Sequence, residues 1–420
     1  MRLALGTYRM GSVLGHAEAM AHAVKGSAAL GNALRIDTAP TYEGGASERL
    51  VGAVLREVDG DGACHVTTKV GVVDGHDTEW FRAGGFGDAV DVGAAVHCLD
   101  PAFIRASLER STERLGRAPS ALLLHNPELH LTAELARFAP ARVAGGAENP
   151  GGAGSDDALL HHMEKNAAAW EETRAQFLER LERAFAGMSE LVSDGLIESY
   201  GVSSNVRGCR ISASGRTPPL SAFEAVSLAE LLDADSAGGG GGLSELQIPL
   251  NVCEPGALLD DGASGAAGAA AGASALDVAA ARGVHVTLNR VLHALPPRGV
   301  GYGDWGRNET FLTLRDAVPM MPAPALFRSV LRDAVLAHEP EVLGDASATS
   351  SALWRMSLQS LALWTAASAP GVGTCLVGAR TKEYIDEVLT VAALPRLAPE
   401  TVRSAFLEAE AALRELTPRV

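Results

Sequence analysis

The chain has 420 residues, which is long enough for one large α/β domain or two ordinary ones. Its 35 basic and 51 acidic side chains give a formal net charge of −16, which disfavours binding to nucleic-acid phosphates or anionic lipid surfaces. Its five cysteines are dispersed without a CxxC pair, so we expect reduced thiols and a cytoplasmic location. The twelve histidines include no HExxH motif, so we expect no metal site.

Two stretches bear on targeting. The chain reaches Gly6 and Thr7 without a long apolar run, which predicts no signal or transit peptide. Residues 356–379 contain no charged side chain and are the stretch to weigh as a membrane span. They include Pro370 and Gly371, however, so a buried helix, a turn and a buried strand explain them better. We therefore expect no membrane interaction.

Short apolar runs alternate with segments of helical period along the chain. The predicted strands are residues 3–7, 34–38, 65–70, 121–125, 199–203, 246–250, 284–288 and 375–377. The predicted helices are residues 17–30, 48–58, 101–115, 168–192, 222–232, 275–281, 353–367, 382–389 and 399–416. This alternation indicates a parallel sheet, and no GxGxxG follows the first strand as a doubly wound dinucleotide fold would require. We predict one α/β domain over residues 1–420, a (β/α)8 TIM barrel.

Such a barrel needs about 250 residues, so the remainder must lie in insertions. Composition places these at about 73–98, 139–157, 236–242, 260–274 and 296–324. The oligoglycine and Gly/Ala tracts offer too few apolar side chains to order themselves, so we expect mobile loops there. The last insertion carries Tyr302 and Trp305, and it either packs against the barrel or caps a pocket.

Polar side chains at or just after the ends of three consecutive predicted strands are candidates for catalysis. Asp37 lies at the end of the second predicted strand, and Tyr42 lies in the loop that follows. Lys69 ends the third strand and His125 the fourth. Reactive groups of a parallel barrel lie at its C-terminal face, so we expect these four to converge. The Lys69 ammonium, held in place by Asp37, would lower the pKa of Tyr42, and His125 would polarise the carbonyl of a substrate. The set has no obvious nucleophile or electron sink, so a cofactor must supply the reducing equivalent.

The motifs around these residues resemble those of the aldo-keto reductases. The four candidates lie in IDTAPTYEGGASERLVG, VTTKVG and LLLHNPE, and further similar motifs are LALGTYRMGS, SYGVSSN, LQIPLN and CLVGARTKEYIDEV. The resemblance implies an NAD(P)H-dependent oxidoreductase that interconverts an aldehyde, ketone or sugar carbonyl and an alcohol. In that reaction Tyr42 is the general acid/base of a hydride transfer, with Asp37, Lys69 and His125 completing a catalytic tetrad.

The resemblance also implies a nicotinamide dinucleotide across the barrel mouth, NADP(H) more than NAD(H). The residues it assigns to the cofactor are Gly6, Thr7, Ser203, Gln247, Arg290, Gly378, Arg380 and Glu387. The first two approach the nicotinamide, the serine and glutamine hold its carboxamide, and the last three embrace the adenosine half. Arg290 is a departure, because many members have an aromatic there that stacks on the nicotinamide. A second function stays open: a nucleotide-sensing regulatory subunit with the same fold and little turnover.

Overall fold

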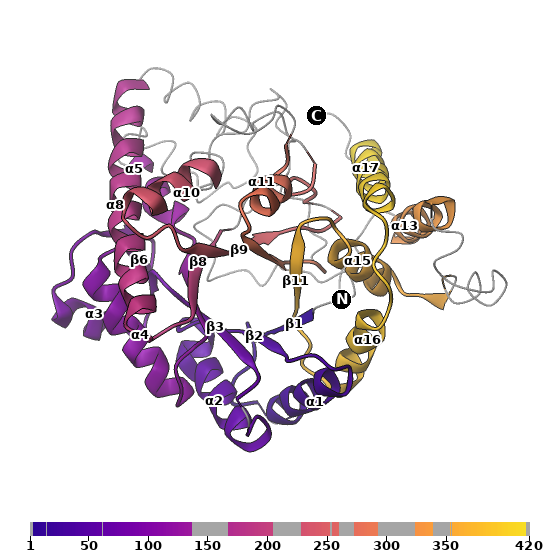
Figure 1. The fold of residues 1–420 in the computed structure, drawn as a ribbon, viewed down its shortest axis with the longest axis horizontal. Helices are drawn as coiled ribbons and strands as arrows, with labels where there is room; N and C mark the ends of the chain where they lie inside the picture. Colours follow the sequence, from indigo (N-terminus) through magenta and orange to yellow (C-terminus); the bar gives the residue numbers. More distant parts are fainter. Residues whose placement is uncertain are drawn as a thin grey trace.

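A computed structural model describes residues 3–13, 15–60, 62–136, 167–204, 228–252, 254–259, 273–292, 324–338, 353 and 355–416. Within this part of the chain, eight parallel strands close into a barrel in the order β1-β11-β10-β9-β8-β7-β3-β2. Figure 1 looks into this barrel and shows the helices around it. The predicted (β/α)8 architecture is confirmed.

The strands follow the predicted apolar runs closely. They are β1 (Leu3–Gly6), β2 (Arg35–Asp37), β3 (His65–Val70), β7 (Ala121–His125), β8 (Ser199–Ser203), β9 (Leu243–Pro249), β10 (His285–Asn289) and β11 (Val372–Val377). Two of them begin three residues earlier than predicted, because polar positions there are paired inside the barrel. Glu245 of β9 accepts a hydrogen bond from Arg35 at 2.8 Å, and Thr374 of β11 bonds His285 at 2.9 Å.

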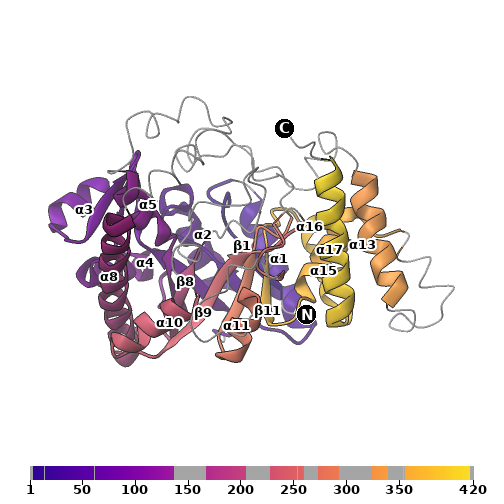
Figure 2. The ribbon, with the colours of Figure 1, turned by 90° about the horizontal axis from the view of Figure 1, so that it is seen from above.

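Most predicted helices are also present. They are α1 (His16–Ala29), α2 (Ala46–Val58), α4 (Pro101–Leu115), α8 (Ala167–Ser193), α10 (Leu228–Ala237), α11 (Ala275–Ala281), α15 (Leu358–Ala367), α16 (Lys382–Ala392) and α17 (Pro399–Leu416). The sequence analysis missed α5 (Glu128–Ala136) and α13 (Pro324–His338). Helix α13 packs against α17 and α15, outside the ring (Figures 1 and 2).

The insertion predicted at 73–98 is folded. It contains α3 (Thr78–Gly84) and most of an antiparallel sheet of β4 (Val72–Val73), β6 (Ala95–Cys98) and β5 (Ala89–Val92). Figure 1 shows α3 at the outer edge of the molecule. A two-residue turn joins the last two strands, with Gly93 at a φ of 72°. Glycine at the first position of such a turn between alternating apolar residues is a hairpin signal that the analysis overlooked.

The tract predicted as an insertion at 236–242 is a short connection in the structure. Residues 236 and 237 end α10, and the glycines that follow form its short connection to β9. Gly240 and Gly241 donate backbone N–H bonds to the Asp235 carbonyl at 3.2 and 3.3 Å, so the tract is a hydrogen-bonded turn. The predictions for 139–157 and for nearly all of 260–274 and 296–324, including Tyr302 and Trp305, lie outside the described residues.

The uncharged stretch at 356–379 folds as a helix, a turn and a strand. Every residue of α15 except Gln359 is buried, Gly371 takes a φ of 79° at the turn, and β11 joins the barrel. Among the helices that the structure describes, none is both long enough and apolar enough to cross a bilayer.

Candidate active site

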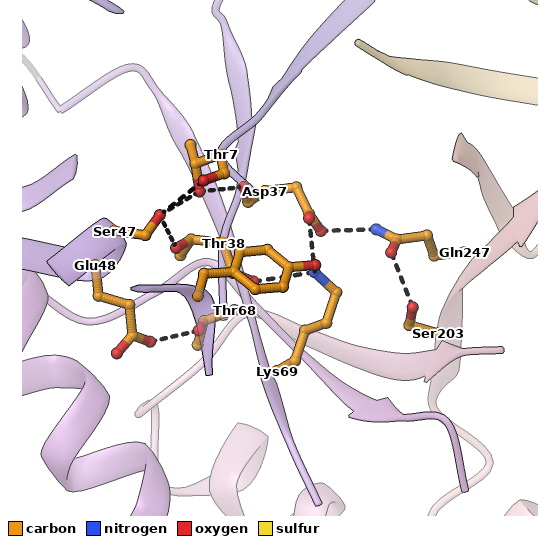
Figure 3. Close-up of polar contacts among 10 residues, drawn as sticks. Thr7, Asp37, Thr38, Ser47, Glu48, Thr68, Lys69, Ser203 and Gln247 are labelled. Carbon is orange, nitrogen blue, oxygen red and sulfur yellow. Dashed lines mark hydrogen bonds and ion pairs between the residues drawn. The ribbon is translucent and has the colours of Figure 1, made fainter. Parts of the chain in front are cut away.

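The predicted catalytic side chains meet at the C-terminal end of the barrel. Strands β2 and β3 pair in parallel, and this pairing brings Asp37 beside Thr67. Lys69, two residues further along β3, therefore lies close to Asp37. The Lys69 Nζ donates hydrogen bonds to Asp37 Oδ1 at 2.6 Å and to the Tyr42 hydroxyl oxygen at 3.1 Å (Figure 3). Tyr42 begins the short 3-10 turn η1 (Tyr42–Gly45), directly before α2. The expected convergence of these three residues is present.

Lys69 is a buried cation whose three donors are all used. Its third hydrogen bond goes to the Thr38 carbonyl at 3.0 Å, and only 1% of its side chain is exposed. Burial by itself lowers the pKa of Lys69, but the neighbouring Asp37 carboxylate and Tyr42 together raise it above its ordinary value. The ammonium is therefore charged at neutral pH and points at the Tyr42 oxygen. A buried ion pair is stable only with this degree of hydrogen bonding.

The second oxygen of Asp37 connects the tetrad to predicted cofactor residues. Gln247 Nε2 donates to Asp37 Oδ2 at 2.7 Å, and Ser203 Oγ donates to Gln247 Oε1 at 2.8 Å. Because a carboxylate only accepts hydrogen bonds, the Gln247 amide has one orientation. Figure 3 shows the resulting chain from Lys69 through Asp37 and Gln247 to Ser203. These contacts join strands β2, β3, β8 and β9 at one end of the barrel.

A buried hydroxyl cluster fixes the backbone at the end of β2. Thr7 Oγ1 donates to the Asp37 carbonyl at 2.9 Å, and Ser47 Oγ donates to Thr7 Oγ1 at 2.6 Å. Ser47 also lies 3.1 Å from the hydroxyl of Thr38 (Figure 3). The sequence analysis missed Ser47. In the sequence, Ser47 is marked only by its place before Glu48 at the start of an amphipathic helix. The structure shows that both residues are fully buried.

Tyr42 is half-buried, and its hydroxyl oxygen accepts from Lys69. The expectation of a lowered pKa is wrong here: burial raises the pKa of Tyr42 above its usual value, and the opposing effect of Lys69 does not outweigh it. Tyr42 therefore keeps its proton at neutral pH. Because Lys69 donates to the phenol oxygen, the phenol proton is left to donate to another group.

His125 faces Tyr42 from the end of β7. The two ring centroids are 6.2 Å apart and nearly perpendicular. Burial, reinforced by the positive charge of Lys69, holds the pKa of His125 well below its usual value. At neutral pH the imidazole is therefore uncharged and able to donate one hydrogen bond.

An aromatic residue that the sequence analysis did not single out stands beside Tyr42. Tyr8 directly follows Thr7, has 53% of its surface exposed, and meets Tyr42 edge-on at a centroid distance of 5.2 Å. An exposed aromatic side chain offers apolar contact area to a ligand. The sequence could have indicated Tyr8, because it directly follows Thr7, a predicted cofactor residue of the first strand.

The predicted residues after β11 form a separate polar edge. Pairing of β1 with β11 brings Gly378 next to Gly6, and Gly378 is exposed. Arg380 is also exposed, and it forms no ion pair with any residue that the structure describes. Thr381 then caps α16 with its side chain. A helix N-terminus beside an arginine suits a phosphate, so these residues fit the anionic part of a dinucleotide.

Two other predicted cofactor residues already bind protein side chains in this structure. Glu387 accepts hydrogen bonds from Ser357 and Ser360, both at 2.7 Å, at the start of α15. Arg290 lies at the end of β10 with a φ of 55°, and its guanidinium contacts Glu254 at 3.4 Å. Both side chains would have to exchange these partners in order to bind a cofactor.

Comparisons with known proteins bear on the family and the fold of the chain. A model of the Aldo/keto reductase family matches residues 2–214, just over half of the chain, while no curated protein sequence matches it. The solved glycerol dehydrogenase of Gluconobacter oxydans is 18% identical, with a TM-score of 0.51 over 98% of this chain and 91% of that one. The holo form of an aldo-keto reductase from Bacillus halodurans is 15% identical, with a TM-score of 0.50 over 98% and 92%. The chain therefore belongs to the aldo/keto reductase family of oxidoreductases.

Proposed function

We propose that the protein is an NADP(H)-dependent oxidoreductase that interconverts an aldehyde, ketone or sugar carbonyl and the corresponding alcohol. The observation that carries this proposal is the hydrogen-bonded set of Asp37, Lys69 and Tyr42, with a neutral His125 facing Tyr42. The set supplies a proton donor at a barrel mouth, and its one amine is a fully hydrogen-bonded ammonium and not a free nucleophile. A nicotinamide dinucleotide bound at this mouth would supply or accept the hydride.

Each residue has a role that follows from its contacts. Tyr42 donates its proton to the carbonyl oxygen as negative charge develops there, and takes it back in the oxidative direction. Lys69 stabilises the phenolate that results, because it donates to that oxygen and stays charged. Asp37 holds the ammonium in place. His125 donates a hydrogen bond to the carbonyl oxygen and Tyr8 offers apolar contact to the substrate.

The cofactor site is inferred from the residues that reach the same end of the barrel as the tetrad. Ser203 and Gln247 would hold the carboxamide, with Gly6 and Thr7 beside the nicotinamide. Gly378, Arg380 and the first turn of α16 would hold the phosphates. Arg380 carries the inferred preference for NADP(H), since the nearby Lys382 is already bonded to Glu18 at 3.1 Å. A free guanidinium suits the extra phosphate of NADP(H).

The first experiment is a fluorescence titration of the protein with NADPH and NADH, followed by single-turnover mixing with a panel of aldehydes, ketones and sugars. We expect binding of NADPH and its oxidation by at least one carbonyl. Tyr42→Phe should keep cofactor binding and lose about 10²- to 10⁴-fold in turnover, the usual contribution of general acid catalysis. Wild-type turnover in Tyr42→Phe would refute the assigned role, and tight binding without any turnover would favour the nucleotide-sensing subunit.

Arg380→Ala tests the cofactor preference. Loss of a charge-assisted hydrogen bond of about 1.5–3 kcal/mol should weaken NADPH binding about 10- to 100-fold and leave NADH binding nearly unchanged. The matched control is Lys382→Ala, which removes a charge that Glu18 already engages. Equal losses for the two cofactors would show that Arg380 does not recognise the extra phosphate.

A further inference from the structure

His125 is held by a residue from outside the barrel strands. Its backbone carbonyl oxygen lies 3.0 Å from Nε2 of His97, which belongs to β6 of the folded insertion. Directly after His125, Asn126 takes a left-handed φ of 52° and donates its N–H to the Ser203 carbonyl at 2.7 Å. The chain therefore bends sharply at the end of β7, and the His97 contact falls at this bend.

The insertion fixes His97 from several sides. It is fully buried, and β6 pairs it with Val72 on one side and Val90 on the other. Its ring meets His130 of α5 edge-on at a centroid distance of 5.9 Å. The strand pairing fixes the backbone of His97, and burial and the His130 contact limit the positions of its ring.

Gly71 leaves the space that the ring needs. It has a φ of 126°, and a Cβ atom there would lie 2.9 Å from His97 Nε2 and 3.5 Å from the His125 carbonyl oxygen. The Cys98 N–H also donates to the Gly71 carbonyl at 2.8 Å, which ties β6 to the end of β3. Any other residue at position 71 would stand where the imidazole reaches the carbonyl oxygen.

The hydrogen bond has one direction. A carbonyl oxygen only accepts, so Nε2 of His97 must carry the hydrogen. Burial lowers the pKa of His97 to about 4, so the ring is neutral at pH 7. The neutral ring has a single N–H, which the carbonyl oxygen of His125 fixes at Nε2.

We propose that His97 is a positioning residue for His125, and that the sheet of β4, β6 and β5 delivers it to the end of β7. This inference rests on the proposed function, in which His125 donates a hydrogen bond to the carbonyl oxygen of the substrate. The His125 side chain is aimed by the backbone that His97 holds. A misplacement of about 1 Å at a catalytic group costs about 100-fold in rate.

The test is a set of variants measured with NADPH and DL-glyceraldehyde, or whichever carbonyl of the panel is reduced fastest. His97→Leu should lower kcat about 10- to 100-fold while the Kd for NADPH changes less than about twofold. His97→Gln should restore kcat to within about threefold, because its amide N–H reaches the same carbonyl. In a His125→Asn background, His97→Leu should have almost no further effect, because the two residues act as one unit.

Two kinetic results would overturn the inference: an equal loss of kcat from His97→Leu in both backgrounds, or a His97→Gln variant as impaired as His97→Leu. A second measurement needs no variant. Histidine ¹⁵N NMR of the wild-type protein should show His97 as the Nε2–H tautomer, and the Nδ1–H tautomer would exclude the hydrogen bond. A wild-type protein that oxidises no NADPH would instead contradict the proposed function, whatever the tautomer.

Discussion

Replacing Lys69 by methionine would leave the Asp37 carboxylate buried without its cation. Only 1% of the Lys69 side chain and 5% of the Asp37 side chain are exposed, so water cannot replace the lost partner. Removing one member of such a pair costs about 3–5 kcal/mol in the free energy of unfolding. Gln247 still donates to the other carboxylate oxygen at 2.7 Å. We therefore expect the free energy of unfolding of Lys69→Met to be about 3 kcal/mol below that of the wild type, near the lower limit of this range.

A second substitution separates the charge effect from lost packing. Asp37→Asn in the Lys69→Met background removes the unpaired charge and keeps an oxygen for Gln247, so the double variant should be about 2 kcal/mol more stable than Lys69→Met. The surface control is Lys25→Met on α1, which is exposed and should change stability by less than about 0.5 kcal/mol.

The assay is urea unfolding followed by far-UV circular dichroism, with the free energy of unfolding extrapolated to water. A Lys69→Met variant within about 1 kcal/mol of wild type would refute the conclusion that Lys69 neutralises a desolvated carboxylate. A double variant as unstable as the single one would assign the loss to packing instead.

Two further predictions concern stability. Burial holds the pKa of His97 at about 4 against an ordinary 6.5, so the unfolded chain binds the proton more readily than the folded one. The free energy of unfolding should therefore fall by about 3 kcal/mol as the pH drops from 6.5 to 4. His97→Gln should lack this part of the acid sensitivity in urea titrations at each pH, and equal pH profiles would contradict the assignment. A Cβ on Gly201 would lie 1.7 Å from the Glu245 carbonyl oxygen. Gly201→Ala should therefore lower the free energy of unfolding by about 3 kcal/mol or more in the same assay. An unchanged urea midpoint would refute the close approach of β8 and β9.

The order of the barrel elements was readable from hydrophobic pattern because buried parallel strands need near-continuous apolar runs. Strands β3, β7 and β8 begin and end at the predicted residues, as do helices α4, α11 and α17. The pattern failed at the start of β9 and β11, where Glu245 and Thr374 face polar partners contributed by other strands. A polar residue in a strand carries no local sign of a partner that is distant in sequence.

The predicted tetrad shows the same division. Position in the chain was enough to place Asp37, Lys69 and His125 at one end of the barrel, because parallel strands all point the same way. Protonation was not readable, since it depends on burial. The pKa of Tyr42 is raised where a lowered value was expected, and that of His125 is depressed.

By itself, the sequence determined the strand-helix repeat and the residue types at each strand end, because both follow from local periodicity and chain order. Only the tertiary structure decided which partners those residues have. It joined Gln247 to Asp37 and brought His97 from the insertion to the carbonyl of His125. It also tied Glu387 to α15 and Arg290 to Glu254. Hydrogen bonds between residues far apart in the chain depend on packing, which no local pattern encodes.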